Sequence, residues 1–180
     1  MNAADAIMAY HEATKHHPNR FARSLGYLDW ANQPDPFRHF EGAPVHPLPL
    51  LARDATPLYD ALFSGSVPAQ PLTRETLAAF FEHSLAISAW KECRGERWAL
   101  RCNPSSGNLH PTEGYAVLGP LEGVHDTPAV YHYAPQDHAL ERRAELAPEF
   151  WHALTKSLPN GAFLVALSSI HWREAWKYGE

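Results

Sequence analysis

The sequence predicts an α+β fold, in which strands and helices pack around one hydrophobic core. Two observations favour this class. Stretches with apolar side chains at helical spacing are interleaved along the chain with short apolar and aromatic runs that are typical of strands. The 180 residues are 45% hydrophobic and 19% charged, which is the composition of a globular chain long enough for a real core.

The first part of the chain, residues 1–71, combines a helix with a proline-rich segment. A helix is expected over residues 4–16, because apolar side chains recur there near helical spacing and Pro18 ends the pattern. Prolines cluster between Pro34 and Pro71, which excludes a long helix or a central strand. We expect this stretch to be an extended arm that wraps over the domain surface or reaches to a partner.

Four further helices are expected. Residues 57–63 form a short one. Thr73 is a good N-cap residue, and the clearest helix follows it and is expected to end near Lys91. Another helix covers residues 148–158, with its proline tolerated in the first turn. The last begins at Trp172 and shows no stop signal, so we expect the chain to end inside an element, as a fragment or as one part of a longer protein.

Strands are expected where short runs of apolar and aromatic residues occur. The candidates are residues 98–102, 115–118, 129–133 and 162–168. The last of these runs is almost continuously apolar, which favours a central strand buried on both faces.

Composition excludes several classes of function. The net charge of −5, with twelve neutral histidines, provides no basic surface, so nucleic acid is not an expected partner. No apolar run approaches the roughly 20 residues that cross a bilayer, and no secretory signal is visible. Two cysteines are too few for a disulfide framework, so we expect reduced thiols in the cytoplasm. The histidines lack ligand partners at zinc-site spacing, and no metal site is expected.

The most informative stretch is the loop that follows Cys102, which reads Asn-Pro-Ser-Ser-Gly-Asn over residues 103–108. Pro104 fixes one backbone angle, and Gly107 can adopt dihedrals that other residues avoid. The short polar side chains between and after them can bond to a ligand or to nearby backbone. On loop chemistry alone, a site for a flat or anionic ligand and a surface turn that satisfies only itself are equally compatible.

A resemblance favours the ligand site. Residues 104–111, Pro-Ser-Ser-Gly-Asn-Leu-His-Pro, followed by Tyr-Ala-Val-Leu at 115–118, resemble the loop and strand of the nitroreductase-like FMN flavoproteins. The run from His110 to Tyr115 is similar to the His-Pro-x-Glu-x-Tyr run of the branch that contains the thiazole/oxazole peptide dehydrogenases. Residues 130–140 resemble that branch's hairpin, and residues 172–180 resemble the start of its flavin-side helix.

The resemblance implies a central, mainly antiparallel sheet flanked by helices, of which residues 72–180 would be the N-terminal part. It also implies FMN as cofactor, with NAD(P)H a candidate electron donor, and a homodimer or a pseudo-dimer with a second half. The positions that it assigns to the cofactor are Arg101, Pro104, Ser105, Ser106, Asn108 and His110. His110 stands where the family usually has glutamine; it and Arg101 are equally compatible with structural roles. No catalytic residue is assigned.

The sequence departs from the family at the phosphate arginines. The family has an Arg-Arg-Ser-x-Arg run near its N-terminus, but residues 58–66 contain no arginine here. Phosphate binding would fall to Arg101, and then to Arg97, Arg173 or Lys177.

Two functions follow. The first is an FMN-dependent oxidoreductase, or part of one, that transfers hydride through flavin N5 to or from a small-molecule or peptide substrate. The alternative is a flavin-free module of the same shape that binds a partner or a peptide.

Overall fold

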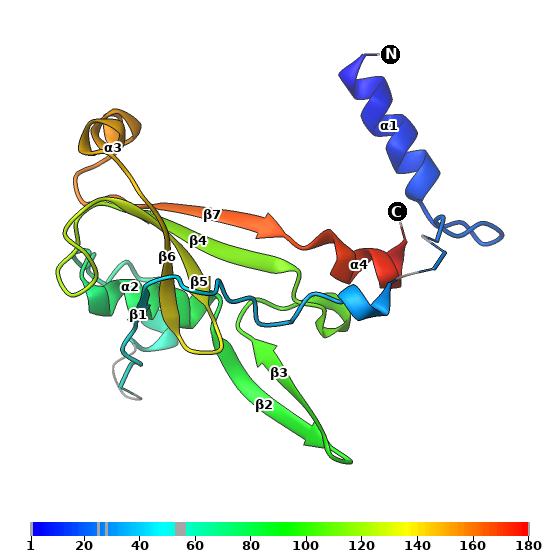
Figure 1. The fold of residues 1–180 in the computed structure, drawn as a ribbon, viewed down its shortest axis with the longest axis horizontal. Coiled ribbons are helices and arrows are strands. Elements are labelled where there is room, and N and C mark those ends of the chain that lie inside the picture. Colours follow the sequence, from blue (N-terminus) through cyan, green and yellow to red (C-terminus); the bar gives the residue numbers. More distant parts are fainter. Residues whose placement is uncertain (1, 25, 28, 53–56, 180) are drawn as a thin grey trace.

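The computed structural model describes residues 2–24, 26–27, 29–52 and 57–179 (Figure 1). Its main element is a five-stranded, fully antiparallel sheet with the strand order β1-β6-β5-β4-β7. The strands of this sheet are β1 (Val45–Pro47), β4 (Thr112–Leu118), β5 (Ala129–Ala134), β6 (Ala139–Glu145) and β7 (Leu164–Ser169). The α+β class and the antiparallel sheet are therefore confirmed.

One face of the sheet carries the hydrophobic core. Helix α2 (Arg74–Ser84) packs on it, with Leu77 and Phe81 fully buried. The ring of Phe81 stacks on that of Tyr133 in β5, with centroids 4.4 Å apart. Thr73 caps the helix as predicted, because its side chain accepts a hydrogen bond from the Thr76 N–H.

The opposite face carries polar side chains and is crossed by an irregular segment. Residues 33–40, which we call the strap, run from the short 3-10 helix η1 (Trp30–Asn32) over the sheet toward β1 (Figure 1). Because successive side chains of a strand point to opposite faces, His132 faces the strap while Tyr133 faces α2. The Phe40 ring lies edge-on to the His132 ring, with centroids 5.1 Å apart.

The predicted end of the helix after Thr73 is wrong. The helix ends at Ser84, and residues expected to continue it form β2 (Ile87–Cys93), which pairs with β3 (Glu96–Arg101) in a separate two-stranded sheet. The turn between β2 and β3 explains why these residues form a hairpin instead of continuing the helix. Arg94 and Gly95 both have positive φ, 52° and 85°, which matches the twist of a tight hairpin.

The strand predicted at residues 162–168 is present as β7, but its central position is wrong. Among the described residues β7 pairs only with β4, so it lies at the edge of the sheet. Val165 and Leu167 are 43% and 64% exposed. A continuous apolar run therefore does not distinguish a central strand from an edge strand.

The remaining elements of the described residues are three helices and two short 3-10 turns. They are α1 (Ala3–Thr14), η2 (Tyr59–Leu62), η3 (Ser106–Asn108), α3 (Pro148–Thr155) and α4 (His171–Tyr178). The segment expected as a short helix at 57–63 is thus a 3-10 turn. Helix α4 ends at Tyr178, and the N–H of its C-cap residue Gly179 bonds to the Ala175 carbonyl at a φ of 79°. That the chain is part of a longer protein stays a prediction. No helix in the described ranges is long and apolar enough to cross a membrane.

Candidate functional site

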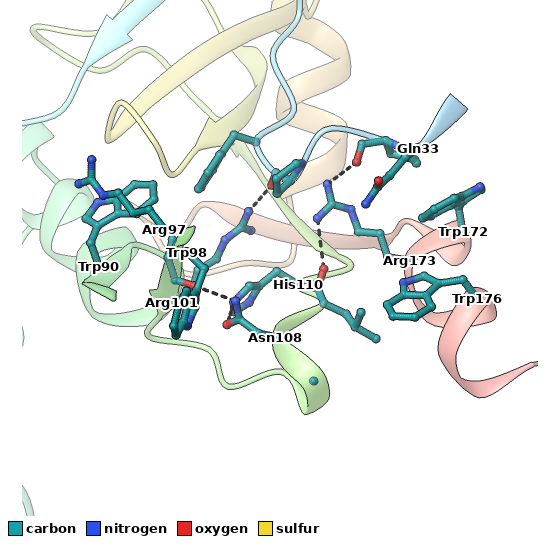
Figure 2. A pocket seen from close by; sticks show the side chains of 16 residues that line it. Gln33, Trp90, Arg97, Trp98, Arg101, Asn108, His110, Trp172, Arg173 and Trp176 are labelled. Carbon is teal, nitrogen blue, oxygen red and sulfur yellow. Dashed lines mark hydrogen bonds between the residues drawn. The ribbon is translucent and has the colours of Figure 1, made fainter. Parts of the chain in front are cut away.

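A cavity of about 330 Å³ lies where the β2–β3 hairpin, the loop before β4, the strap and α4 meet (Figure 2). Its walls are mostly aromatic and cationic. They are formed by Gln33, Pro34, Pro36, Phe37, Trp90, Arg97, Trp98, Ala99, Arg101, Gly107, Asn108, Leu109, His110, Trp172, Arg173 and Trp176. None of these side chains is a carboxylate, so the pocket is positively charged although the whole chain is acidic.

The loop before β4 is tightly kinked. Gly107, Asn108 and His110 all have positive φ, between 47° and 67°. Such angles are uncommon outside glycine and are retained where surrounding contacts enforce them. Here the Asn108 amide donates to the Ala99 carbonyl at 3.0 Å, and the His110 N–H donates to Ser105 Oγ at 3.0 Å. The first bond holds the loop against β3, and the second closes the loop on itself.

The same contacts fix the tautomer of His110. Because the Asn108 nitrogen bonds to a carbonyl, its Oδ1 must face His110 Nε2, 2.7 Å away, and Nε2 must carry the proton. Burial lowers the pKa of His110, and the positive charge of Arg101 lowers it further. A neutral ring leaves Nδ1 as an acceptor, and this atom is buried and has no partner among the described residues.

Two buried arginines line the pocket. Arg101 and Arg173 are only 8% and 6% exposed, yet neither forms an ion pair with a carboxylate in the described part of the chain. Burial lowers the pKa of both guanidinium groups. Each retains a buried Nε with no hydrogen-bond partner among the described residues. Buried arginines without an acidic partner are well suited to bind an anion.

Backbone carbonyls of the strap and of Leu109 accept hydrogen bonds from the Nη atoms of these arginines. Arg101 Nη2 donates to the Pro36 carbonyl at 2.5 Å. Arg173 Nη2 donates to the carbonyls of Pro34, at 3.1 Å, and Asp35, and its Nη1 donates to the Leu109 carbonyl at 3.1 Å. These bonds fix both guanidinium planes without neutralising their charge.

Aromatic rings form two walls of the pocket (Figure 2). On one side the Arg97 guanidinium stacks over Trp90, 4.2 Å from the ring centroid. On the other, Trp172 and Trp176 of α4 each pack edge-on against Trp30, with centroids 5.4 and 5.6 Å apart. Flat apolar surfaces of this kind can hold a planar ligand.

The residues singled out in the sequence divide between the pocket and its supports. Arg101, Asn108 and His110 line the pocket, as do Arg97 and Arg173. Pro104, Ser105 and Ser106 are not among the lining residues. The Ser106 hydroxyl lies 2.5 Å from that of Tyr178, which joins the loop to α4, and the Lys177 side chain crosses Gly107, where a Cβ would lie 2.1 Å from its Nζ.

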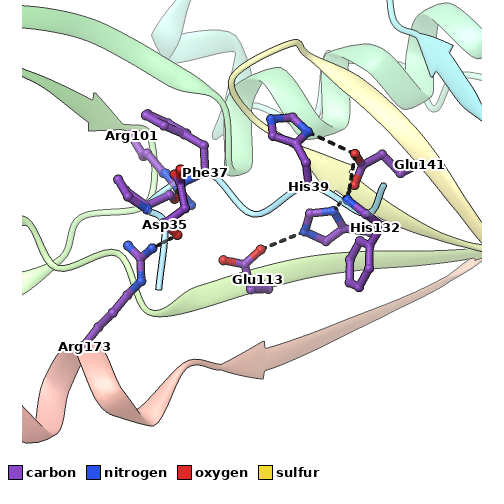
Figure 3. Close-up of polar contacts among 10 residues, drawn as sticks. Asp35, Phe37, His39, Arg101, Glu113, His132, Glu141 and Arg173 are labelled. Carbon is purple, nitrogen blue, oxygen red and sulfur yellow. Dashed lines mark hydrogen bonds and ion pairs between the residues drawn. The ribbon is translucent and has the colours of Figure 1, made fainter. Parts of the chain in front are cut away.

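Sequence reasoning expected an extended arm over the surface from Pro34 onward, but it did not assign the strap or the tryptophans to the pocket. It also missed a buried polar network behind the pocket (Figure 3). His132 is fully buried between two carboxylates: its Nε2 lies 2.7 Å from Glu113 Oε2 and its Nδ1 2.8 Å from Glu141 Oε2. Glu141 Oε1 also accepts from His39 Nδ1 at 3.0 Å and from the Phe40 N–H at 3.3 Å. The network therefore ties the strap to β4, β5 and β6. Along each strand the sequence shows which side chains share a face of the sheet. The pairing between strands, which brings the three side chains together, is not visible in the sequence.

The bond between His39 and Glu141 should make stability depend on pH. The hydrogen bond to Glu141 raises the pKa of His39 above 6.5, so its contribution is complete below that pH and is lost as the pH rises through the raised value. Burial raises the pKa of Glu141, but hydrogen bonds from His132, His39 and Phe40 lower it more, to a net value below 4.5; its contribution is lost as the pH falls through that value. Stability from this contact should be greatest between pH 4.5 and 6.5.

Urea denaturation from below pH 4.5 to above pH 6.5 checks the expectation. His39→Gln should flatten the alkaline limb of the profile and weaken the acid limb, which is retained in part because His132 and the Phe40 N–H still bond to Glu141. An unchanged alkaline slope in that variant would show that His39 does not contribute.

The fold of this chain is nitroreductase-like, as a comparison with a solved structure shows. A solved structure of a proposed nitroreductase from Anabaena variabilis is similar to 95% of this chain, with a TM-score of 0.65 and 24% sequence identity. This likeness establishes the fold. The chain spans 33% of that protein's length.

A second solved structure is the Escherichia coli microcin synthetase McbBCD complex with truncated pro-MccB17 bound. The match covers 99% of this chain and 59% of that chain, at 17% identity and a TM-score of 0.42. No protein-family model and no curated protein matches the sequence.

Proposed function

We propose that this chain forms part of an FMN-dependent oxidoreductase of the nitroreductase type. The observation that carries the proposal is the meeting, in one pocket, of two buried arginines that lack acidic partners with aromatic walls. A flavin mononucleotide combines an anionic phosphate, a polar ribityl chain and a flat ring. The pocket offers a complementary group for each of these parts.

The residues present fit the cofactor. Arg101 and Arg173 would hold the phosphate through charge-assisted hydrogen bonds, in place of the arginine run missing from residues 58–66. His110 Nδ1 is an acceptor for a hydroxyl or ring N–H. The tryptophans provide planar contacts, and the volume of about 330 Å³ lies within the range of small-molecule sites.

The bound flavin would supply two-electron hydride chemistry at N5, and the protein would position the reactants. The substrate would be a small molecule or a peptide, and NAD(P)H is a candidate electron donor. We propose that the pocket is completed by a second subunit or a second half, since the chain covers only part of its structural neighbour. We also propose that the protein is located in the cytoplasm.

An absorbance scan of the purified complete gene product tests the proposal directly. We expect a band at about 450 nm, either on purification or after reconstitution with FMN, because flavins absorb there. Residues 1–180 alone should bind FMN weakly or not at all. A colourless complete protein that FMN does not reconstitute would instead support the flavin-free binding module.

Asn108→Ala in the complete protein should weaken FMN binding by about 1–3 kcal/mol, because the change removes two hydrogen bonds that shape the loop and fix the His110 tautomer. The dissociation constant can be measured by quenching of flavin fluorescence. Asn160→Ala, at an exposed position before β7, is the matched control. Equal affinities of the two variants would contradict a role for Asn108 at the site.

A further inference from the structure

A buried carboxylate lies close behind the two pocket arginines (Figure 3). Glu113 in β4 is 2% exposed, and its Oε2 is bonded to His132. Its Oε1 is buried without a hydrogen-bond partner among the described residues. In Figure 3 this second oxygen lies on the side of Arg101 and Arg173. A buried carboxylate oxygen without a hydrogen-bond partner costs free energy. The positive charges of the two arginines can offset part of that cost.

The charge of Glu113 acts on both arginines without contacting them. Burial is the largest influence on the pKa of Arg101 and of Arg173 and lowers it, and the negative charge of Glu113 is the strongest influence in the opposite direction at each. No nitrogen–oxygen pair within 4.0 Å joins Glu113 to either arginine in the described part of the chain. The negative charge of Glu113 therefore offsets part of the positive charge of Arg101 and Arg173 without direct contact.

Two sets of bonds keep the charges apart. His132 holds Glu113 from one side and is itself held by Glu141, whose other oxygen is bonded to His39 and Phe40 of the strap. The strap carbonyls hold the arginines from the other side. In this arrangement Glu113 forms no direct ion pair with either arginine among the described residues, and both guanidinium groups stay in the pocket lining.

We propose that Glu113 is a fixed countercharge that sets the affinity of the Arg101–Arg173 pair for an anionic phosphate group, and that His132 positions it. The inference rests on the proposed function in naming the phosphate of FMN as the anion. A unit negative charge near the pair lowers its attraction for a phosphate. The site therefore holds the anion less tightly than two unscreened buried arginines would.

The experiment uses the complete gene product and three ligands: FMN, riboflavin and inorganic phosphate. Binding is followed by the fluorescence of the pocket tryptophans. Glu113→Gln should lower the dissociation constants of FMN and phosphate roughly tenfold, as expected for removing a unit charge at intermediate dielectric. Riboflavin has no phosphate, so its constant should stay within about twofold, the scale expected without a Coulomb term.

Matched variants separate charge from structure. Glu113→Asp keeps the charge and should not tighten FMN binding. Glu149→Gln makes the same change in net charge at an exposed position of α3 and should also have no effect. If Glu113→Gln does not fold, Glu113→Ala removes the same charge. The ratio of the riboflavin and FMN constants remains informative, because a loss of folded protein affects both ligands equally.

The outcomes distinguish this inference from the proposed function. If FMN binds and loss of the Glu113 charge leaves its affinity unchanged or weaker, the inference is wrong and the proposed function stands. If phosphate binds with the expected response but FMN does not bind, the proposed function fails and the countercharge stands. Binding of neither ligand overturns both.

Discussion

Replacing His132 with alanine is expected to lower the free energy of unfolding by about 3–5 kcal/mol, because it leaves two buried carboxylates without the hydrogen-bond partner that they share. The two carboxylates that it joins, Glu113 and Glu141, are 2% and 3% exposed. Without the imidazole, two acidic groups would face each other across β5 in a site closed to solvent. Desolvation and mutual repulsion would then both destabilise the folded state.

Urea denaturation of the complete protein at neutral pH measures this effect. His152→Ala, at an exposed position of α3, is the control and should change stability by no more than about 0.5 kcal/mol. His132→Ala combined with Glu113→Gln and Glu141→Gln should recover part of the loss, because the unpaired charges are removed. A loss below about 1 kcal/mol for His132→Ala would mean that the network contributes little, as expected for a surface pair.

Local patterns in the sequence predicted the elements whose cause is local. Thr73 indicated the start of α2 because an N-cap side chain bonds to the helix that follows it. The loop after Cys102 was recognised because Pro104 and Gly107 set its backbone angles, and the structure shows positive φ at Gly107 and also at Asn108. A similar local signal at Arg94 and Gly95 marks the turn of the hairpin between β2 and β3, but the helix was expected to continue to Lys91, close to that turn.

Features that depend on distant residues could not be predicted in this way. Phe37 and Gln33 reach the pocket only because the strap crosses the sheet, and no periodicity encodes that path. Glu113, His132 and Glu141 meet because β4, β5 and β6 pair in one particular register, with His132 opposite Glu141. A single sequence contains the alternation of each strand but not the pairing between strands.

Loss of either buried arginine should weaken FMN binding by about 1.5–3 kcal/mol, the usual contribution of a hydrogen bond to a charged group. Arg101→Gln and Arg173→Gln keep part of the hydrogen bonding to the strap while removing the charge. Each should therefore raise the dissociation constant of FMN by about tenfold or more and leave that of riboflavin nearly unchanged. The double variant should lose more than either single variant, because both guanidinium groups serve the same anion.

Flavin fluorescence quenching in the complete protein provides these constants. Arg94→Gln, in the hairpin turn and outside the pocket lining, is the matched control for the loss of one positive charge. An equal loss of FMN and riboflavin binding in Arg101→Gln or Arg173→Gln would indicate that the arginine acts only by holding the strap in place. A selective loss of FMN binding would assign the phosphate to that guanidinium, since riboflavin differs from FMN by that group alone.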